Sequence, residues 1–115
     1  MKTFTVDEAR ALLPDVRSLG DDIVDARARL TLARHADPAP PPADLKGLEA
    51  RLSDLIETLA SMGLQVKGWA PLLVDFPMEH DGRLVLLCWL EGETELAWYH
   101  DADHGFPGRR RLDDL

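Results

Sequence analysis

The chain has 115 residues, 45% of them apolar and 30% charged, with a formal net charge of −8. This length suits one domain with its own core, so we expect a single domain over residues 1–115. Such acidity disfavours general nucleic-acid binding, because a phosphate backbone would repel the chain. No apolar run approaches the roughly 20 residues of a membrane helix, and no signal-peptide pattern is present. We therefore expect a cytoplasmic protein with neither a membrane nor a nucleic-acid partner.

Residues 1–62 carry the pattern of a helical hairpin. Thr5 and Glu8 have the spacing of a capping box, in which hydroxyl and carboxylate each accept from a backbone amide, so the first helix should begin at Val6. Pro14 lacks an amide hydrogen and disfavours helix at the residue before it. We expect a break or kink there, with Pro14 in the first turn of a second, longer helical piece.

Beyond Pro14, apolar residues recur at alternating steps of three and four in two segments. The first contains Val16, Leu19, Ile23, Ala26, Leu30 and Ala33, and the second contains Leu45, Leu48, Leu52, Leu55, Leu59 and Met62. This spacing predicts a narrow apolar seam on each of two helices. The Pro-rich residues 36–43 forbid a continuous helix and make the two helices antiparallel neighbours. Gly63 should end the second helix as a left-handed cap.

Residues 63–115 predict a small antiparallel β-meander followed by a C-terminal tail. A continuous apolar run at 84–90 and a second extended segment at 95–100 predict a hairpin around the turn at 91–94, and another turn at 80–83 precedes it. The predicted fold class is therefore α+β, a long antiparallel helical hairpin packed on a small three- to four-stranded meander.

The apolar run at 84–90 has no polar residue on either face of its strand. The helical hairpin can cover only one face, so a partner, the C-terminal tail or the segment before Pro14 must cover the other. We favour a homodimer, because a narrow seam on each helix also suits pairing into a four-helix bundle. The alternative is a monomer whose tail folds back over the sheet.

Cys88, the only cysteine, excludes an intramolecular disulfide and belongs to one candidate metal set. The side chains that offer sulfur, imidazole or carboxylate to a zinc-like ion are Cys88, His100, Asp101, Asp103 and His104. The spacing contains no paired-cysteine motif, and a four-residue turn would point Cys88 and His100 to opposite faces. We therefore expect no metal and no other cofactor, with His100, Asp101 and His104 as the alternative metal set. The same geometry disfavours a Cys–His nucleophile, and a buried thiol is inert.

A polar cluster of Asp75, His100, Asp101 and Arg109 is the candidate ligand site, with Trp89 as its aromatic neighbour. In the structural interpretation, Arg109 ties the tail to Asp75 or Asp101 through its guanidinium fork. In the functional interpretation, these side chains form a small pocket for an anionic or polar ligand. Large aromatic residues at strand spacing are more often core, which also applies to Trp89.

Several short motifs together resemble a known family. They are Phe4-Thr5, Ala11-Leu12-Leu13-Pro14, Asp75-Phe76-Pro77, Leu87-Cys88-Trp89, Gly92-Glu93, an aromatic pair before His100, and Gly105-Phe106-x-Gly108-Arg109. In combination they resemble the uncharacterised bacterial family called domain of unknown function 2203. The resemblance covers nearly the whole chain and implies a small soluble bacterial protein without an assigned activity. It also implies that Asp75, Trp89, His100, Phe106 and Arg109 belong to the family's pattern. The order Trp98-Tyr99, the pair Asp103-His104 and Pro107 depart from that pattern.

Two functions follow from the sequence. The leading hypothesis is a non-enzymatic, self-associating interaction or scaffold module that uses the helical hairpin. The alternative is a small-molecule or metal-binding protein, possibly catalytic, that uses His100 with Asp75, Asp101 and Arg109.

Overall fold

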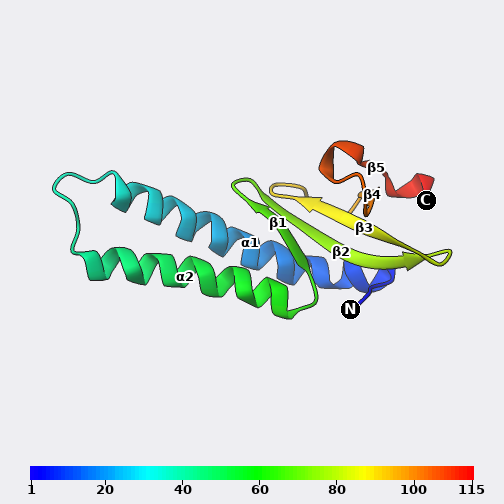
Figure 1. Ribbon diagram of the computed structural model, residues 1–115, viewed down its shortest axis with the longest axis horizontal. Helices are drawn as coiled ribbons and strands as arrows, with labels where there is room; N and C mark the ends of the chain where they lie inside the picture. Colours follow the sequence, from blue (N-terminus) through cyan, green and yellow to red (C-terminus); the bar gives the residue numbers. More distant parts are fainter.

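The computed structural model describes residues 1–115 as a helical hairpin with a β-sheet packed against its base (Figure 1). Helix α1 spans Val6–Arg34 and helix α2 spans Pro42–Ser61, and the molecule measures 56 × 24 × 24 Å. The strands are β1 (Gln65–Trp69), β2 (Leu72–His80), β3 (Arg83–Leu90), β4 (Trp98–Asp101) and β5 (Arg110–Arg111). The α+β prediction is confirmed. Neither helix combines the length and the apolarity needed to span a bilayer.

The start of α1 is confirmed, but the predicted break at Pro14 is wrong. Thr5 and Glu8 form the capping box, and α1 then continues through Pro14 without interruption. The missing amide of Pro14 removes one hydrogen bond, that to the carbonyl of Arg10. Buried Leu13 and Val16 flank the proline and pack into one core, so tertiary packing holds the helix together on both sides.

The second helix follows the prediction closely. It begins at Pro42, inside the connection predicted at 36–43, because a proline suits the first helical position, where no amide donor is needed. It ends at Ser61, and Gly63 has φ +89°, the left-handed conformation expected of a C-terminal cap.

The sheet is a simple antiparallel meander in the order β1-β2-β3-β4-β5. Asp81 and Gly82, both with positive φ, form the two-residue turn between β2 and β3, within the turn predicted at 80–83. The predicted three or four strands become five because the C-terminal tail adds Arg110–Arg111 beside β4.

The face assignment of the third and fourth strands was wrong. The connection between them is longer than four residues, because β3 ends at Leu90 and β4 begins only at Trp98. The resulting register pairs Leu86 with His100 and Cys88 with Trp98. Since alternate residues share a face, Cys88 and His100 point to the same side of the sheet.

The core lies between the helices and one face of this sheet. Val74 and Phe76 of β2 and Leu87 and Trp89 of β3 belong to the same buried cluster as the helical seams. Gly20 of α1 permits this packing, because a Cβ there would lie 3.0 Å from Cη2 of Trp89.

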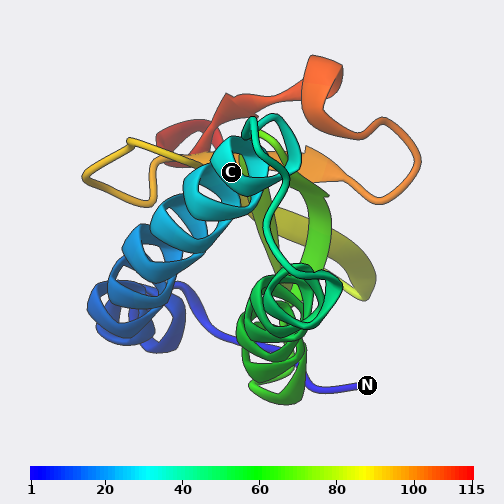
Figure 2. The ribbon, with the colours of Figure 1, turned by 90° about the vertical axis from the view of Figure 1, so that its left-hand side faces the viewer.

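The C-terminal tail covers part of the opposite sheet face (Figure 2). On this face Leu86 is 2% and Cys88 1% exposed within a single chain. Phe106, in a short 3₁₀ turn of the tail, lies over it, and the chain then returns to the core at Leu112. The C-terminal tail, one of the three segments expected to cover the second face of the apolar strand at 84–90, therefore covers part of that face.

Candidate functional site

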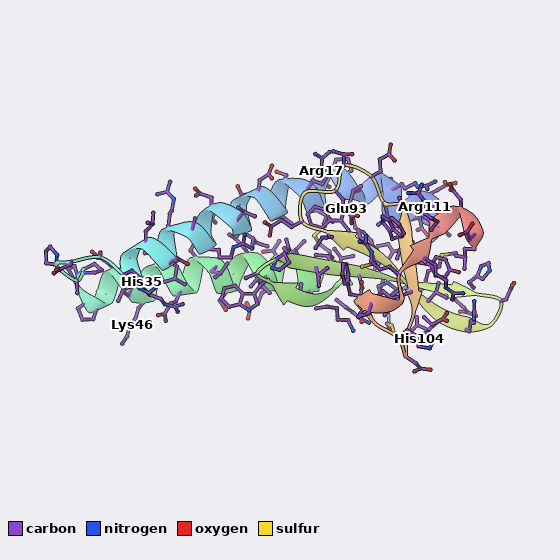
Figure 3. The ribbon with its side chains drawn as sticks, turned by 90° about the horizontal axis from the view of Figure 1, so that it is seen from above. Arg17, His35, Lys46, Glu93, His104 and Arg111 are labelled. Atoms are coloured by element: carbon purple, nitrogen blue, oxygen red, sulfur yellow. The ribbon has the colours of Figure 1, made fainter.

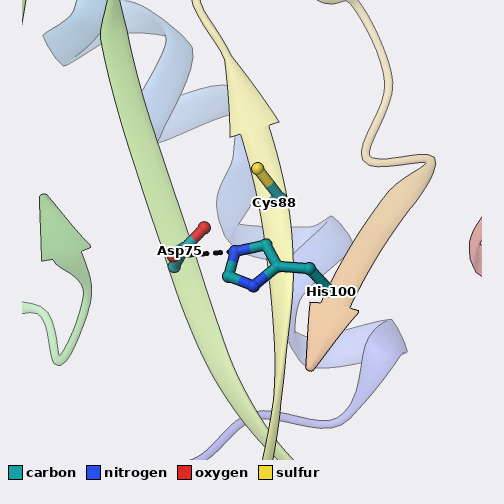
Figure 4. A group of neighbouring side chains, drawn as sticks. All are labelled: Asp75, Cys88 and His100. Atoms are coloured by element: carbon teal, nitrogen blue, oxygen red, sulfur yellow. Dashed lines mark hydrogen bonds and ion pairs between the residues drawn. The ribbon is translucent and has the colours of Figure 1, made fainter. Parts of the chain in front are cut away.

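Three side chains from adjacent strands meet on the sheet face away from the helices (Figure 4). Asp75 lies on β2 directly opposite Cys88 on β3, and His100 on β4 projects to the same face. All three are buried, and their ligand atoms lie within 4.8 Å of one another. The meander therefore brings a carboxylate, a thiol and an imidazole together. The opposite faces predicted for Cys88 and His100 had counted against such a cluster.

The hydrogen bonds of His100 fix the role of its Nδ1 and leave two possible roles for its Nε2. Nδ1 lies 2.8 Å from the carbonyl oxygen of Asp101, which only accepts, so Nδ1 carries a proton. Nε2 lies 3.1 Å from Oδ2 of Asp75, and this contact also needs one proton. Either Asp75 is protonated and donates, or His100 is an imidazolium and donates. In both cases the pair is neutral overall and shares one removable proton.

Burial controls the acidity of the other two groups. It raises the pKa of Asp75, although the neighbouring His100 opposes the rise. Burial raises the pKa of the Cys88 thiol to about 12, and the charge of Asp75 adds to that effect. The thiol is therefore protonated at neutral pH and is a poor nucleophile on its own. Only a cation that replaces its proton would convert it to a thiolate.

A cleft of about 120 Å³ opens beside the cluster. Its remaining walls come from Lys67, Leu73, Ala102, Gly105 and Phe106. Lys67 is exposed, and its positive charge lowers the pKa of Asp75, so its ammonium acts on the cluster. The cleft is thus lined by the polar cluster and by the positively charged Lys67, and the C-terminal tail covers it with Phe106.

A larger cavity, of about 420 Å³, lies elsewhere, between the start of α1 and the connection before β4. Its charged residues are Arg10, Glu95, Arg111 and Asp113, two of each sign. It contains no thiol or imidazole and no buried titratable group. Its size alone does not make it a site, so the smaller cleft is the stronger functional candidate.

The structure separates Asp101 and His104 from the cluster. Asp101 contributes only its backbone carbonyl, while its carboxylate contacts Arg110 at 3.0 Å and Arg83 at 3.5 Å. The exposed His104 lies 3.5 Å from the same carboxylate, and Asp103 is exposed. The alternative metal set of His100, Asp101 and His104 therefore does not converge on one point.

Arg109 and Trp89 add no ligand atom to the cluster, although Arg109 donates a hydrogen bond of 3.3 Å to the backbone carbonyl of Cys88. Arg109 pairs with Glu93 at 2.6 Å, not with Asp75 or Asp101 as the structural interpretation expected. Its guanidinium lies 4.9 Å from the ring centroids of both Trp98 and Phe106, so it fixes the tail to the connection before β4. Trp89 faces the core and donates its indole N–H to the carbonyl of Glu93.

Sequence reasoning weighed Cys88 as a metal ligand but set it aside because of the predicted faces, and it named neither Lys67 nor Glu93 as a site residue. An odd or an even number of residues in the connection before β4 decides whether His100 lies on the same sheet face as Cys88. The sequence leaves this number open. Lys67 lines the cleft from a β-bulge in β1, where the pairing with β2 shifts between Val66 and Gly68. For Glu93 one signal was present, since Gly92-Glu93 is among the motifs that carry the family resemblance.

The donors of the cluster suit a transition metal. Thiolate sulfur, imidazole nitrogen and carboxylate oxygen are the ligands of zinc in proteins, and three protein ligands leave a fourth position open. A metal-binding histidine usually donates its other N–H to a carbonyl or carboxylate, which is the role Nδ1 of His100 already plays. The residues present therefore fit such an ion.

The fold and this cluster define a small α+β protein with a buried Asp–Cys–His site under its C-terminal tail. The chain belongs to the family described as uncharacterized conserved protein (DUF2203), whose model matches residues 2–112. The resemblance stated from the motifs is therefore confirmed. No curated protein and no solved structure matches the chain.

Proposed function

We propose that the protein binds a divalent transition metal, with zinc as the best chemical match, through Asp75, Cys88 and His100. The observation that supports this most is the arrangement of His100. Its Nδ1 is tied to the carbonyl of Asp101, and its Nε2 is directed at Asp75 within reach of the Cys88 sulfur. In metal sites the same tie fixes the tautomer and the orientation of the ring.

The burial of the cluster supports the same proposal. Burying a carboxylic acid and an imidazole costs free energy even when the two are hydrogen-bonded to each other. An apolar pair of similar volume would fill this position on the sheet at less cost. A metal ion offsets that cost in the bound state, because it supplies two positive charges to a thiolate and a carboxylate. The proposal thus explains why polar groups are present where the sheet is otherwise apolar.

Cobalt(II) provides the test, because it occupies zinc sites and its bond to a thiolate gives a charge-transfer absorption band. Titration of the reduced protein with cobalt should produce this band at one equivalent, and zinc should remove it. Asp75→Asn should retain the fold, because an amide can replace the hydrogen bond to His100. It should lose at least the about 10- to 100-fold in metal affinity that an outer-shell partner contributes, because the amide offers the ion no negative charge.

The control is His104→Gln, which alters an exposed imidazole outside the cluster. This variant should bind cobalt as the wild type does. Circular dichroism of each variant separates loss of metal from loss of fold. A wild-type protein that shows no thiolate band under these conditions would refute the metal site, whatever the variants do.

A second candidate function, self-association, is supported by the half of the hairpin that extends beyond the sheet. A groove of about 210 Å³ there is lined by Leu52, Ile56 and Trp69, and Trp69 is 45% exposed. Arg34 and Glu49 at the same groove pair with each other at 3.5 Å, so their charges compensate and would not repel a second copy related by two-fold symmetry. We propose a homodimer of this kind, in the cytoplasm.

Analytical ultracentrifugation tests the dimer. The wild type should sediment as a dimer at micromolar concentration, and Trp69→Ser should shift the equilibrium toward the monomer. Leu32→Ser is the control, because Leu32 is 73% exposed but lies outside the groove. A wild type that stays monomeric at high concentration would exclude self-association through the groove and leave the metal site unaffected.

A further inference from the structure

The side chain of Lys67 reaches the cleft from an irregular position in β1. Val66 pairs with Val74 and Gly68 pairs with Leu73, so Lys67 is an extra residue, a β-bulge in an otherwise regular ladder. Bulges redirect side chains and occur often beside functional sites. Lys67 lines the cleft together with Asp75, Cys88 and His100, and it has no salt bridge of its own.

With a divalent metal bound, the positive charge of Lys67 is the one charge at the cleft that no negative group balances. A divalent ion held by the Cys88 thiolate, the Asp75 carboxylate and a neutral His100 forms a neutral centre. The ammonium of Lys67 beside it then makes the cleft cationic. An anion that entered the open coordination position would meet both the metal and this ammonium.

The size and the lining of the cleft restrict the anion. Its volume of about 120 Å³ equals the share of about four water molecules, at about 30 Å³ each. Leu73, Ala102 and Phe106 supply apolar surface in the same cleft. These features suit a small molecule with one anionic end and a short apolar end.

We infer that the cleft binds a small carboxylate, with one oxygen on the metal and the other paired to the Lys67 ammonium. This inference rests on the proposed metal site, because the metal supplies one of the two contacts. It adds to that proposal the chemical class of the ligand and a residue that selects it.

Acetate is the probe, and the cobalt-loaded protein reports its binding through the visible absorption of the metal. Acetate should change this spectrum saturably, whereas acetamide, which has the same shape without the charge, should not. Lys67→Met should weaken acetate binding about tenfold while it leaves the cobalt–thiolate band intact. The control is Lys46→Met, at the far end of the hairpin (Figure 3), which should bind acetate as the wild type does.

The outcomes separate the two proposals. A protein that fails to bind cobalt, which is seen before acetate is added, overturns both the metal site and the carboxylate site. If cobalt binds but acetate has no effect, acetamide acts equally, or Lys67→Met binds acetate with unchanged affinity, only the carboxylate inference is overturned. The retained thiolate band shows in each case that the variant is folded.

Discussion

Cys88 illustrates how strongly the surroundings of one side chain decide its chemistry. Beside Leu87 and Trp89 it has the sequence context of an ordinary buried thiol, and it is 1% exposed. Its neighbours across the sheet, Asp75 and His100, make it part of a polar cluster. The residue is a poor nucleophile with its pKa raised by burial, yet it would become a strong ligand if a metal replaced its proton.

The raised pKa of Cys88 predicts a loss of stability at alkaline pH. In the unfolded chain the thiol ionises near its usual pKa of 9.0, whereas in the metal-free fold it stays protonated up to about 12. The stabilisation is fully present below about 9 and is lost between about 9 and about 12, because there only the unfolded state gives up this proton. From about pH 8 to about pH 10 the wild type should lose about 1.4 kcal/mol more than Cys88→Ala.

Urea melts of both proteins at the two pH values, with chelator and reductant present, measure this difference. Other groups that titrate in the same range contribute equally to both proteins and cancel in the comparison. Equal losses in the two proteins would mean that the thiol is accessible to solvent in the fold.

Two glycines, each inside a helix, test how the helices pack. Gly20 of α1 faces Trp89 and Leu72, whereas a Cβ at Gly47 of α2 would have no neighbour within 4 Å. Gly47→Ala should stabilise the protein by about 0.5–1 kcal/mol, because alanine is the better helix former. Gly20→Leu should destabilise it by about 1–3 kcal/mol or more, because the core has no room for the added atoms. Denaturant midpoints measure both effects, and a tolerated leucine at Gly20 would refute the close approach of helix and sheet.

At the level of elements, the sequence predicted what depends on local signals and missed what depends on tertiary context. The capping box at Thr5, the seams of the hairpin and the left-handed Gly63 are local and were predicted correctly. Pro14 was misread, because its cost is one hydrogen bond and the buried residues around it outweigh that cost. The shared face of Cys88 and His100 was missed, because one residue more or less in a connection reverses every side chain of the next strand.

At the scale of the whole molecule, metal binding at the proposed site should be coupled to the stability of the entire domain. The three proposed ligands come from β2, β3 and β4, and the tail that covers them is held by Arg109 against Glu93, Trp98 and Phe106. Unfolding would separate all of these groups, so a metal that binds only the native state must stabilise the entire domain. At a free metal concentration of 100 times the dissociation constant, this stabilisation amounts to about 2.7 kcal/mol.

Zinc X-ray absorption spectroscopy of the protein loaded with one equivalent tests the central claim most directly, because it counts sulfur ligands at the metal. The account predicts one sulfur at about 2.3 Å, supplied by Cys88, and nitrogen or oxygen ligands at about 2.0–2.2 Å. A coordination shell of nitrogen and oxygen alone would place the zinc on surface side chains, and Asp75, Cys88 and His100 would then be a structural hydrogen-bonded cluster and not a metal site.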